Sequence, residues 1–246
     1  MGYADALMSM GIKYSESKDF CQKMMDFMAN QAFMASTKLA KEKMPNGINS
    51  ELYVQSPFIK RALKPEVIEH IKTHGIRNMN VLAMAPTGTI SMMFGVSSGI
   101  EPIYQKSYYR KDGLTGEARL YHHPVYQMCM KKSNFKELDE RGVFETALDL
   151  TPVQHLEIHG AFAPYVDSSI SKTCNLPSTA TIEDVDKAFR LARKLGIKST
   201  TVFRSGSRNG VLTEIKPELC DKCGSVLQTD SNCTFCPSCG KSKCSI

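Results

Sequence analysis

A strand, a helix and a second strand that follow one another late in the chain constrain the fold most strongly. The first predicted strand runs from Tyr165 to Leu176, and the second from Ser199 to Phe203. Between them, Thr181 and Asp184 form a capping-box pattern that predicts a helix start, and Gly196 is typical of a helix end. Because parallel neighbours need such a crossover, the spacing predicts a parallel pair and an α/β fold.

The first third of the chain predicts two helices and a further strand. A helix is expected from Ser17 to Lys43 and another from Pro65 to His74, since proline favours the first helical turn. The apolar run from Met79 to Ala85 predicts a strand buried on both faces of a parallel sheet. The buried face of the long helix is expected to carry residues spaced by three and four: Phe20, Met24, Phe27, Met28, Ala32, Ala35 and Leu39.

The composition excludes several classes of protein. Of the 246 residues, 42% are hydrophobic and 23% are charged, which predicts a globular domain with room for a small appendage. The net charge of +6 is not gathered into a basic stripe, so it favours an anionic small molecule over nucleic acid. The sequence lacks a long apolar run and a secretory pattern, so we expect no membrane span and a cytoplasmic location.

A hydroxyl-rich loop follows the strand predicted at 79–85. Its glycine would let a ligand approach the backbone, and a helix starting there would offer free amides to an anion. The loop lacks the Gly-Lys-[Ser/Thr] ending of a Walker motif, so by itself the pattern favours a tight structural turn. The loop consists of Pro86, Thr87, Gly88, Thr89, Ile90 and Ser91.

Six of the nine cysteines lie in a short tail and predict a metal site there. Cys220 and Cys223, and likewise Cys236 and Cys239, form two C-x-x-C-Gly knuckles, a spacing typical of a zinc ribbon. The tail contains too few apolar groups to fold unaided, so bound zinc would supply the free energy of folding. The sequence leaves open whether the other two, Cys233 and Cys244, form a thiol–disulfide pair or Cys233 replaces a zinc ligand. We therefore expect a body at 1–210 and a zinc-ribbon-like tail at 211–246.

Several motifs, in the same order, resemble the C-terminal part of a ribonucleotide reductase, and most closely the adenosylcobalamin-dependent class II. The resemblance covers nearly the whole chain, and chance agreement of so many motifs is implausible. The motifs are MGYADAL at 1–7, APTGTIS at 85–91, SSGIEP at 97–102, VDSSISKT at 166–173, NLP at 175–177, TVFR at 201–204 and GSR at 206–208.

The resemblance implies a fold and a set of roles. The fold would be the C-terminal portion of a ten-stranded α/β barrel, followed by the zinc-ribbon-like module. The loop at 86–91 would hold the phosphates of a ribonucleotide that is reduced to a deoxyribonucleotide by radical chemistry for DNA synthesis. Ser97, Ser98 and Glu101 would be pocket neighbours. Tail cysteines, with Cys233 and Cys244 as candidates, would relay reducing equivalents from a thioredoxin-like reductant, and adenosylcobalamin would be bound largely by another part of the enzyme.

One departure from the family pattern bears on activity. The radical cysteine of the family lies in an Asn-x-Cys-x-Glu setting, which this sequence lacks, and Cys21, Cys129 and Cys174 match none of the family's catalytic positions. Cys174 is expected to be a small core group. The chain would then carry no catalytic residue and would form about half a barrel with open strand edges. It would need an N-terminal reductase polypeptide with the radical cysteine. The other interpretations are a truncated fragment and a zinc-ribbon regulatory protein that binds nucleotide or nucleic acid.

Overall fold

The computed structural model describes two compact units. The described residues are 1–111, 118–207, 222, 227–230, 233–236 and 239–244. The first unit comprises Met1–Lys106 and His123–Arg208, and the second comprises Ser107–His122 and Asn209–Ile246. The tail therefore groups with the segment 107–122, a grouping that the sequence patterns did not indicate.

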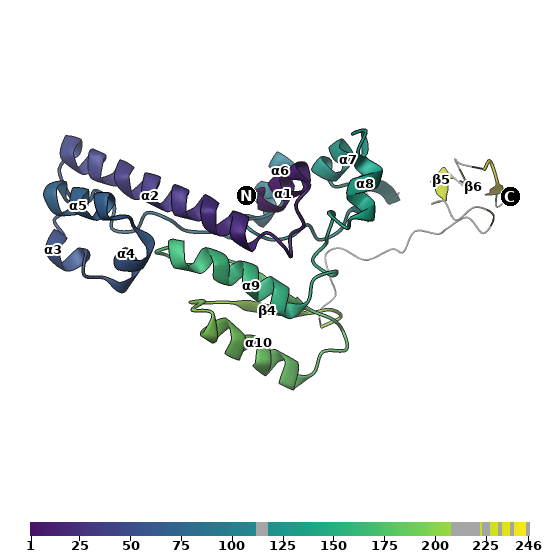
Figure 1. The fold of residues 1–246 in the computed structure, drawn as a ribbon. Helices are drawn as coiled ribbons and strands as arrows, with labels where there is room; N and C mark the ends of the chain where they lie inside the picture. Colours follow the sequence, from purple (N-terminus) through teal and green to yellow (C-terminus); the bar gives the residue numbers. More distant parts are fainter. Residues whose placement is uncertain (112–117, 208–221, 223–226, 231–232, 237–238, 245–246) are drawn as a thin grey trace. The chain divides into compact units, whose positions relative to one another are not determined.

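The first unit is mostly helical, with one short parallel sheet. In Figure 1 the long helix α2 packs against α5 near one end and against α9 near the other. The helices are α1 (Tyr3–Met10), α2 (Lys18–Lys43), α3 (Ser50–Tyr53), α4 (Pro57–Ala62), α5 (Pro65–His74), α6 (Gly88–Phe94), α7 (Pro124–Met130), α8 (Phe135–Glu140), α9 (Pro152–Phe162) and α10 (Ile182–Lys194). The strands are β3 (Thr173–Leu176) and β4 (Thr201–Arg204).

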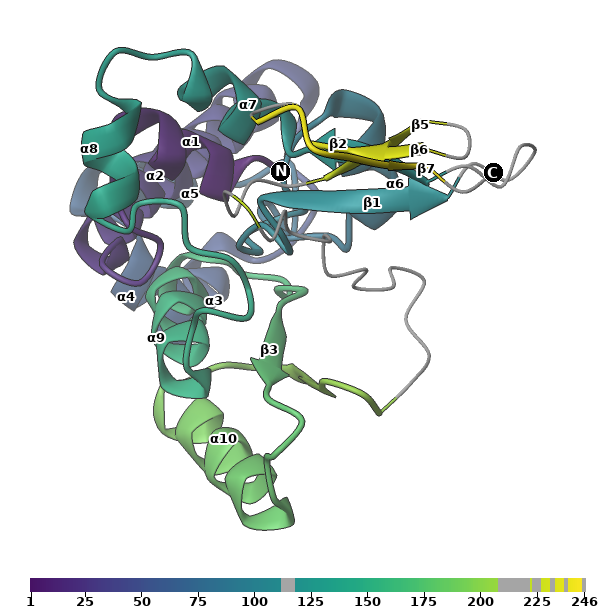
Figure 2. The same ribbon diagram turned by 90° about the vertical axis from the view of Figure 1, so that its right-hand side faces the viewer.

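The crossover predicted near the end of the body is confirmed. Strand β3 pairs in parallel with β4, in a register that places Thr173 opposite Thr201. Helix α10 lies between them in sequence and packs against α9, as Figure 2 shows. The capping box is present as well, because Thr181 Oγ1 accepts from the Asp184 amide and the Asp184 carboxylate accepts from the Thr181 amide. The mixture of helices and parallel strands is that of an α/β fold.

Two predicted strands are shorter than expected. Residues Ala163–Tyr165 form a 3-10 helix, so only 173–176 of the first predicted strand is a strand. The run 79–85 contributes a single parallel bridge, between Met84 and Ile170. Its start is held by a side chain instead of a strand, because the Asp167 carboxylate accepts from the Val81 and Leu82 amides at 2.7 and 2.8 Å.

The long helix α2 has the predicted bounds but a different buried face. The predicted Phe27, Met28 and Leu39 are exposed, by 64%, 42% and 39%. One position along a helix turns the direction of the side chain by about 100°, so a shift of one residue selects an adjacent face, against which the predicted Phe20 and Met24 still pack in part. The chosen side carries many small side chains, which lets α5 and α9 approach closely. Its buried residues are Cys21, Met25, Ala29, Asn30, Phe33, Ser36, Thr37 and Ala40.

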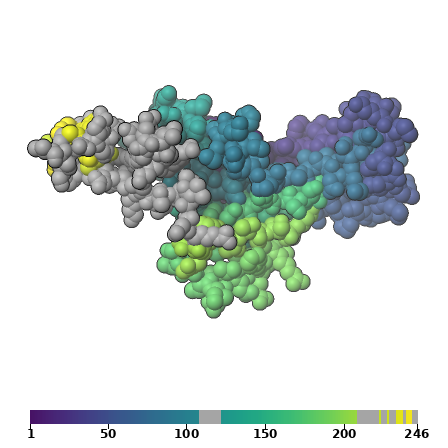
Figure 3. All heavy atoms as spheres, turned by 180° about the vertical axis from the view of Figure 1, so that it is seen from behind, coloured from purple at the N-terminus to yellow at the C-terminus, as the bar shows by residue number. Residues whose placement is uncertain are grey.

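Two apolar clusters form the core of the first unit. One includes Phe144, Leu156 and Phe162 and joins α1 and α9 to the sheet, and the other lies where α4 and α5 cover α2 around Phe33 and Ile71. Figure 3 shows these N-terminal helices in purple and blue packed against the green segment that ends at β4. No helix among the described residues is both long and apolar enough to cross a membrane.

The second unit contains two small antiparallel sheets. Strand β1 (Ser107–Lys111) pairs with β2 (Ala118–His122). In the tail, β5 (Gln228–Asp230), β6 (Cys233–Phe235) and β7 (Ser242–Cys244) form a three-stranded sheet in that order. In its register, Cys233 on β6 lies opposite Cys244 on β7.

Candidate functional site

The structure brings the two hydroxyl-rich segments together at the start of α6. Thr87 is the N-cap of this helix, as expected for a helix that begins at the loop. Its Oγ1 accepts from the Gly99 amide at 2.9 Å and lies 3.2 Å from Ser98 Oγ. An N-cap hydroxyl normally accepts from the first helical turn, but that of Thr87 does not. The first-turn amides of α6 therefore have no side-chain cap and are available to an outside acceptor.

The predicted loop residues divide into an open and a closed group. Pro86, Gly88, Thr89 and Ile90 are exposed, and a Cβ added at Gly88 would meet no atom within 4 Å. Ser91 is buried, and its hydroxyl donates to the Gly88 carbonyl at 2.8 Å. The open group can therefore meet a ligand, whereas Ser91 stabilises the helix turn.

Ser97 is part of the scaffold beneath the loop. Its amide donates to Asp5 Oδ2 at 2.6 Å, and its carbonyl accepts from the Gly2 amide at 2.9 Å. Both Ser97 and Asp5 are buried, with 6% exposure each. The N-terminal motif at 1–7 thus has a structural reason, because it anchors the start of the second hydroxyl-rich segment.

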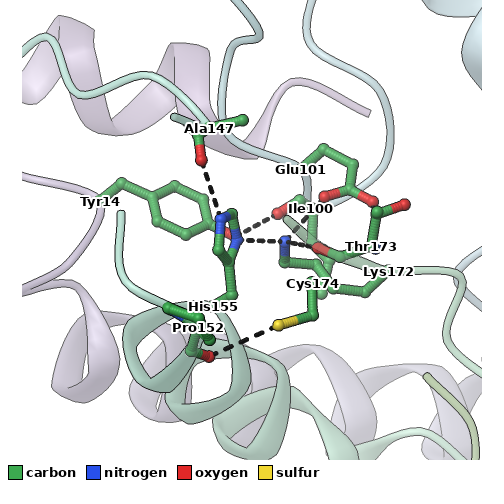
Figure 4. Close-up of polar contacts among 9 residues, drawn as sticks. All are labelled: Tyr14, Ile100, Glu101, Ala147, Pro152, His155, Lys172, Thr173 and Cys174. Atoms are coloured by element: carbon green, nitrogen blue, oxygen red, sulfur yellow. Dashed lines mark hydrogen bonds and ion pairs between the residues drawn. The ribbon is translucent and has the colours of Figure 1, made fainter. Parts of the chain in front are cut away.

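Glu101 lies at the other end of that segment and, itself half-buried, forms an ion pair with the buried Lys172 (Figure 4). Its Oε2 accepts from Lys172 Nζ at 2.7 Å, and its Oε1 accepts from the Thr173 amide at 2.6 Å. Lys172 Nζ also donates to the Thr173 carbonyl at 2.8 Å and to His155 Nδ1 at 3.1 Å. The Lys172 side chain is 1% exposed, so the ammonium group meets three acceptors and almost no solvent.

The protonation states in this network follow from its contacts. Burial lowers the pKa of Lys172, whereas the Glu101 carboxylate acts to raise it. Hydrogen bonds from the ammonium group to Glu101 and to the other two acceptors favour the charged form. Burial, and then the Lys172 charge, lower the pKa of His155 to about 3. His155 is therefore neutral at pH 7. Because its Nδ1 accepts from Lys172, its Nε2 carries the proton and donates to the Ala147 carbonyl at 3.0 Å.

A cavity of about 520 Å³ adjoins the loop at Pro86. It is lined by 83–86, 168–172 and 199–201, and small hydroxyl side chains predominate. The cavity lies where β3 and β4 begin, although α/β sites are generally expected at the carboxyl ends of strands. The loop at 86–91 satisfies that expectation, since it follows the extended segment that bridges Ile170.

Residues 1–203 match the family described as "Ribonucleotide reductase, barrel domain". The chain belongs to this family. Three relatives give the degree of similarity. The vitamin B12-dependent ribonucleoside-diphosphate reductase of Thermoplasma acidophilum is 30% identical, over 99% of this chain and 34% of its own length. The vitamin B12-dependent ribonucleoside-diphosphate reductase of Mycobacterium tuberculosis is 30% identical, over 89% of this chain and 32% of its own length. The vitamin B12-dependent ribonucleotide reductase of Streptomyces avermitilis is 24% identical, over 68% of this chain and 20% of its own length.

The chain spans about a third of the length of the first two relatives.

The three isolated cysteines of this reductase chain are core residues. Cys21, Cys129 and Cys174 are all buried, with at most 1% exposure, which confirms the prediction for Cys174. Burial raises the pKa of Cys21 to about 12 and that of Cys174 to about 11. Both thiols are therefore protonated at pH 7 and are poor nucleophiles.

The predicted zinc ligands lie partly outside the described residues. Cys220 and Cys223 are not described, whereas Cys236 is buried and Cys239 is half-buried. Within the described part of the chain, no three histidine, cysteine or acidic residues are grouped so as to hold a metal ion. Cys233 is disulfide-bonded, and its role stays a prediction. The zinc site itself stays a prediction.

Sequence reasoning missed the Lys172–His155 part of the network. Lys172 lies within the strand predicted at 165–176, just before Thr173, and such a lysine is a signal of a partner, because a lysine is almost never fully buried unless it is paired. His155 and His159 share one face of α9, four residues apart, and both are buried. The partners themselves come from distant segments, and no local pattern reveals them.

Proposed function

We propose that this chain supplies the substrate-phosphate loop and part of the barrel of an adenosylcobalamin-dependent ribonucleotide reductase, which converts ribonucleotides to deoxyribonucleotides. The observation that carries the proposal is that the hydroxyl of Thr87, the N-cap residue of α6, is hydrogen-bonded outside the helix and does not cap it. The Thr87 hydroxyl is engaged by Gly99, so the exposed first-turn amides of α6 can bind a phosphate. Phosphate binding at an exposed Gly88 fits the open space around that residue.

The role of this chain in the reaction is to bind and orient the substrate. The amides of Gly88 and Thr89 would donate to phosphate oxygens, and the hydroxyls of Thr89 and Ser98 lie on or beside the same loop. Such positioning contributes to catalysis without any redox change in these residues. The radical cysteine and the reducing dithiol would come from another polypeptide.

The described residues do not by themselves fit a cobalamin. The cavity beside Pro86 is lined by alanines and small hydroxyl side chains, and the His155 ring is already hydrogen-bonded on both nitrogens. When bound to the whole enzyme, adenosylcobalamin supplies the radical that starts the reaction. We therefore assign its binding mainly to the partner polypeptide.

Two exposed features support a partner that completes the barrel. Among the described residues β4 pairs only with β3, so its second edge is open to another strand. Next to the phosphate loop, α6 exposes four large apolar side chains, and such a patch typically marks an interface. These are Ile90, Met92, Met93 and Phe94, exposed by 51%, 65%, 80% and 70%.

Nucleotide binding by the full chain tests the phosphate assignment. We choose CDP as the probe because two relatives are named as ribonucleoside-diphosphate reductases. CDP should shift the amide resonances of Gly88, Thr89 and Ile90 in an NMR titration, whereas cytidine, which lacks phosphates, should leave them in place. Equal shifts with both ligands, or shifts confined to other residues, would show that the loop does not bind phosphate.

We also propose that the tail binds one zinc ion through Cys220, Cys223, Cys236 and Cys239, because of their twin-knuckle spacing. Elemental analysis should give about one zinc per chain. The double variant Cys220→Ser/Cys223→Ser should lose it, while Cys21→Ser, a change in the core, should retain it. Zinc content that survives the double substitution would reject this ligand set.

The remaining thiols of the tail are proposed to act in reduction. Cys233 is disulfide-bonded and lies opposite Cys244 in the β6–β7 register, as a redox pair requires. A thioredoxin-like reductant would reduce this pair to two thiols. These thiols would then reduce the active-site disulfide of the partner polypeptide to its dithiol by thiol–disulfide exchange, and the tail pair would return to the disulfide form.

A further inference from the structure

The two groups that contact the Thr87 hydroxyl belong to the segment 97–101. The Gly99 amide and the Ser98 hydroxyl both contact Thr87 Oγ1. If this segment moved, the Thr87 hydroxyl would be free to cap the first turn of α6, as an N-cap threonine usually does. The position of the segment therefore decides whether the amides of α6 stay open to an outside acceptor.

Charged side chains hold the segment at both ends, the buried Asp5 at one and the half-buried Glu101 at the other. At the first end, the Asp5 carboxylate accepts from the Ser97 amide at 2.6 Å. At the second end, both oxygens of Glu101 are engaged, one by Lys172 Nζ and one by the Thr173 amide. The Glu101 amide in turn donates to the Ser98 carbonyl at 2.8 Å, which links the carboxylate anchor directly to the residue beside Thr87.

The second anchor is itself fixed from three directions. Lys172 Nζ donates to Glu101, to the Thr173 carbonyl and to His155 Nδ1, and His155 is held by the Ala147 carbonyl (Figure 4). Every proton of the ammonium group is used, and its side chain is 1% exposed. A contiguous series of contacts thus runs from α9 through Lys172 and Glu101 to the segment beside the loop.

Stability alone does not explain this arrangement. A buried ion pair contributes little net stability compared with apolar side chains of similar volume, because both charges lose their hydration. What an ion pair with every acceptor satisfied provides is a defined geometry. We propose that Lys172 is a positioning residue that, through Glu101, fixes Ser98 and Gly99 against Thr87 and so keeps the phosphate-binding amides of α6 open. This inference rests on the function proposed above.

The test compares single and double substitutions that separate positioning from stability. Lys172→Met leaves the half-buried Glu101 without its cation, so we expect both a lower unfolding temperature and weaker CDP binding. In Lys172→Met/Glu101→Gln neither charge remains, so the unfolding temperature should recover towards the original value. CDP affinity should nevertheless stay about tenfold lower, the loss expected when a group that binds by charge-assisted hydrogen bonds is mispositioned. If affinity recovers together with unfolding temperature, the pair only stabilises the fold and the inference is wrong.

A second lysine whose ammonium group has three acceptors, but whose side chain is exposed, provides the control. Lys198 Nζ also donates to three backbone carbonyls, those of Val166, Asp167 and Ser168, but it contacts no residue of 97–101. Lys198→Met should therefore leave the loop and its CDP affinity unchanged, apart from any loss of folded protein. An equal loss of affinity in Lys198→Met would overturn the specific role of Lys172.

A readout without nucleotide keeps this inference separate from the phosphate assignment. Hydrogen exchange of the Gly99 amide, which donates to Thr87, should accelerate in the double variant and not in Lys198→Met. Faster exchange without CDP binding in the original chain would reject the phosphate assignment and retain the positioning contact. Unchanged exchange in the double variant would reject the positioning role of Lys172. The phosphate assignment could still hold in that case, and weaker CDP binding by Thr87→Val would support it.

Discussion

The purified chain alone should show no ribonucleotide reduction, even with adenosylcobalamin, a thioredoxin-type reductant and effector nucleotides present. The family's chemistry removes the ribose 3′-hydrogen with a protein sulfur radical and reduces the 2′-carbon with an adjacent dithiol. Cys21, Cys129 and Cys174 belong to α2, α7 and β3, and each is buried in the core. These thiols can therefore provide neither an accessible radical nor a neighbouring pair.

Mixing the chain with an N-terminal reductase polypeptide that carries the radical cysteine should restore turnover. Co-purification followed by an assay for deoxyribonucleotide measures both steps. Met93→Lys should weaken the association, because it places a charge on the apolar patch of α6, where Met93 is 80% exposed. Ile182→Lys, on α10 at 84% exposure, is the matched control and should associate normally. Robust turnover by the chain alone, or no association with such a polypeptide, would contradict the split-enzyme proposal.

Gly88→Val should abolish nucleotide turnover in the assembled enzyme while leaving the fold intact. The valine methyl groups would occupy the space through which a phosphate approaches the first-turn amides of α6. A Cβ at Gly88 meets no atom within 4 Å, so the substitution causes no clash within the chain. Gly88 is also absent from the glycines with positive φ, so backbone strain does not contribute.

A graded series separates the steric effect from a loss of fold. Gly88→Ala adds one methyl group and should reduce CDP affinity less than Gly88→Val does. Thermal unfolding of both variants should stay close to that of the original chain, because the added groups face open space. Normal CDP affinity in Gly88→Val would show that phosphate does not approach at this residue.

Local patterns predicted the elements whose signals lie within a few residues. Thr181 marks the start of α10, because its side chain accepts from a free amide of the first turn. Pro65 marks the start of α5, because proline has no amide proton that would be left without a partner there. The same applies to Thr151, whose side chain forms a capping box with Gln154 at the start of α9, although this signal was not used.

The choice of a buried helix face could not be made locally. Helix α2 carries apolar side chains on two adjacent faces, and either face satisfies a spacing of three and four. Packing against α5 and α9 selected the face with Ala29 and Phe33 and left Phe27 exposed. The extent of the strand predicted at 79–85 was decided in the same way, because Asp167 competes with a neighbouring strand for its amides.

By itself, the sequence determined the family, the parallel crossover around α10 and the hydroxyl-rich loop at the start of α6, because each depends on residues close together in the chain. Only the tertiary structure decided which loop residues are open and which are scaffold. It made Ser97 and Glu101 anchors, because Asp5 and Lys172 reach them from segments 92 and 71 residues away. Contacts between segments so far apart depend on how the elements pack, and packing is a property of the folded chain as a whole.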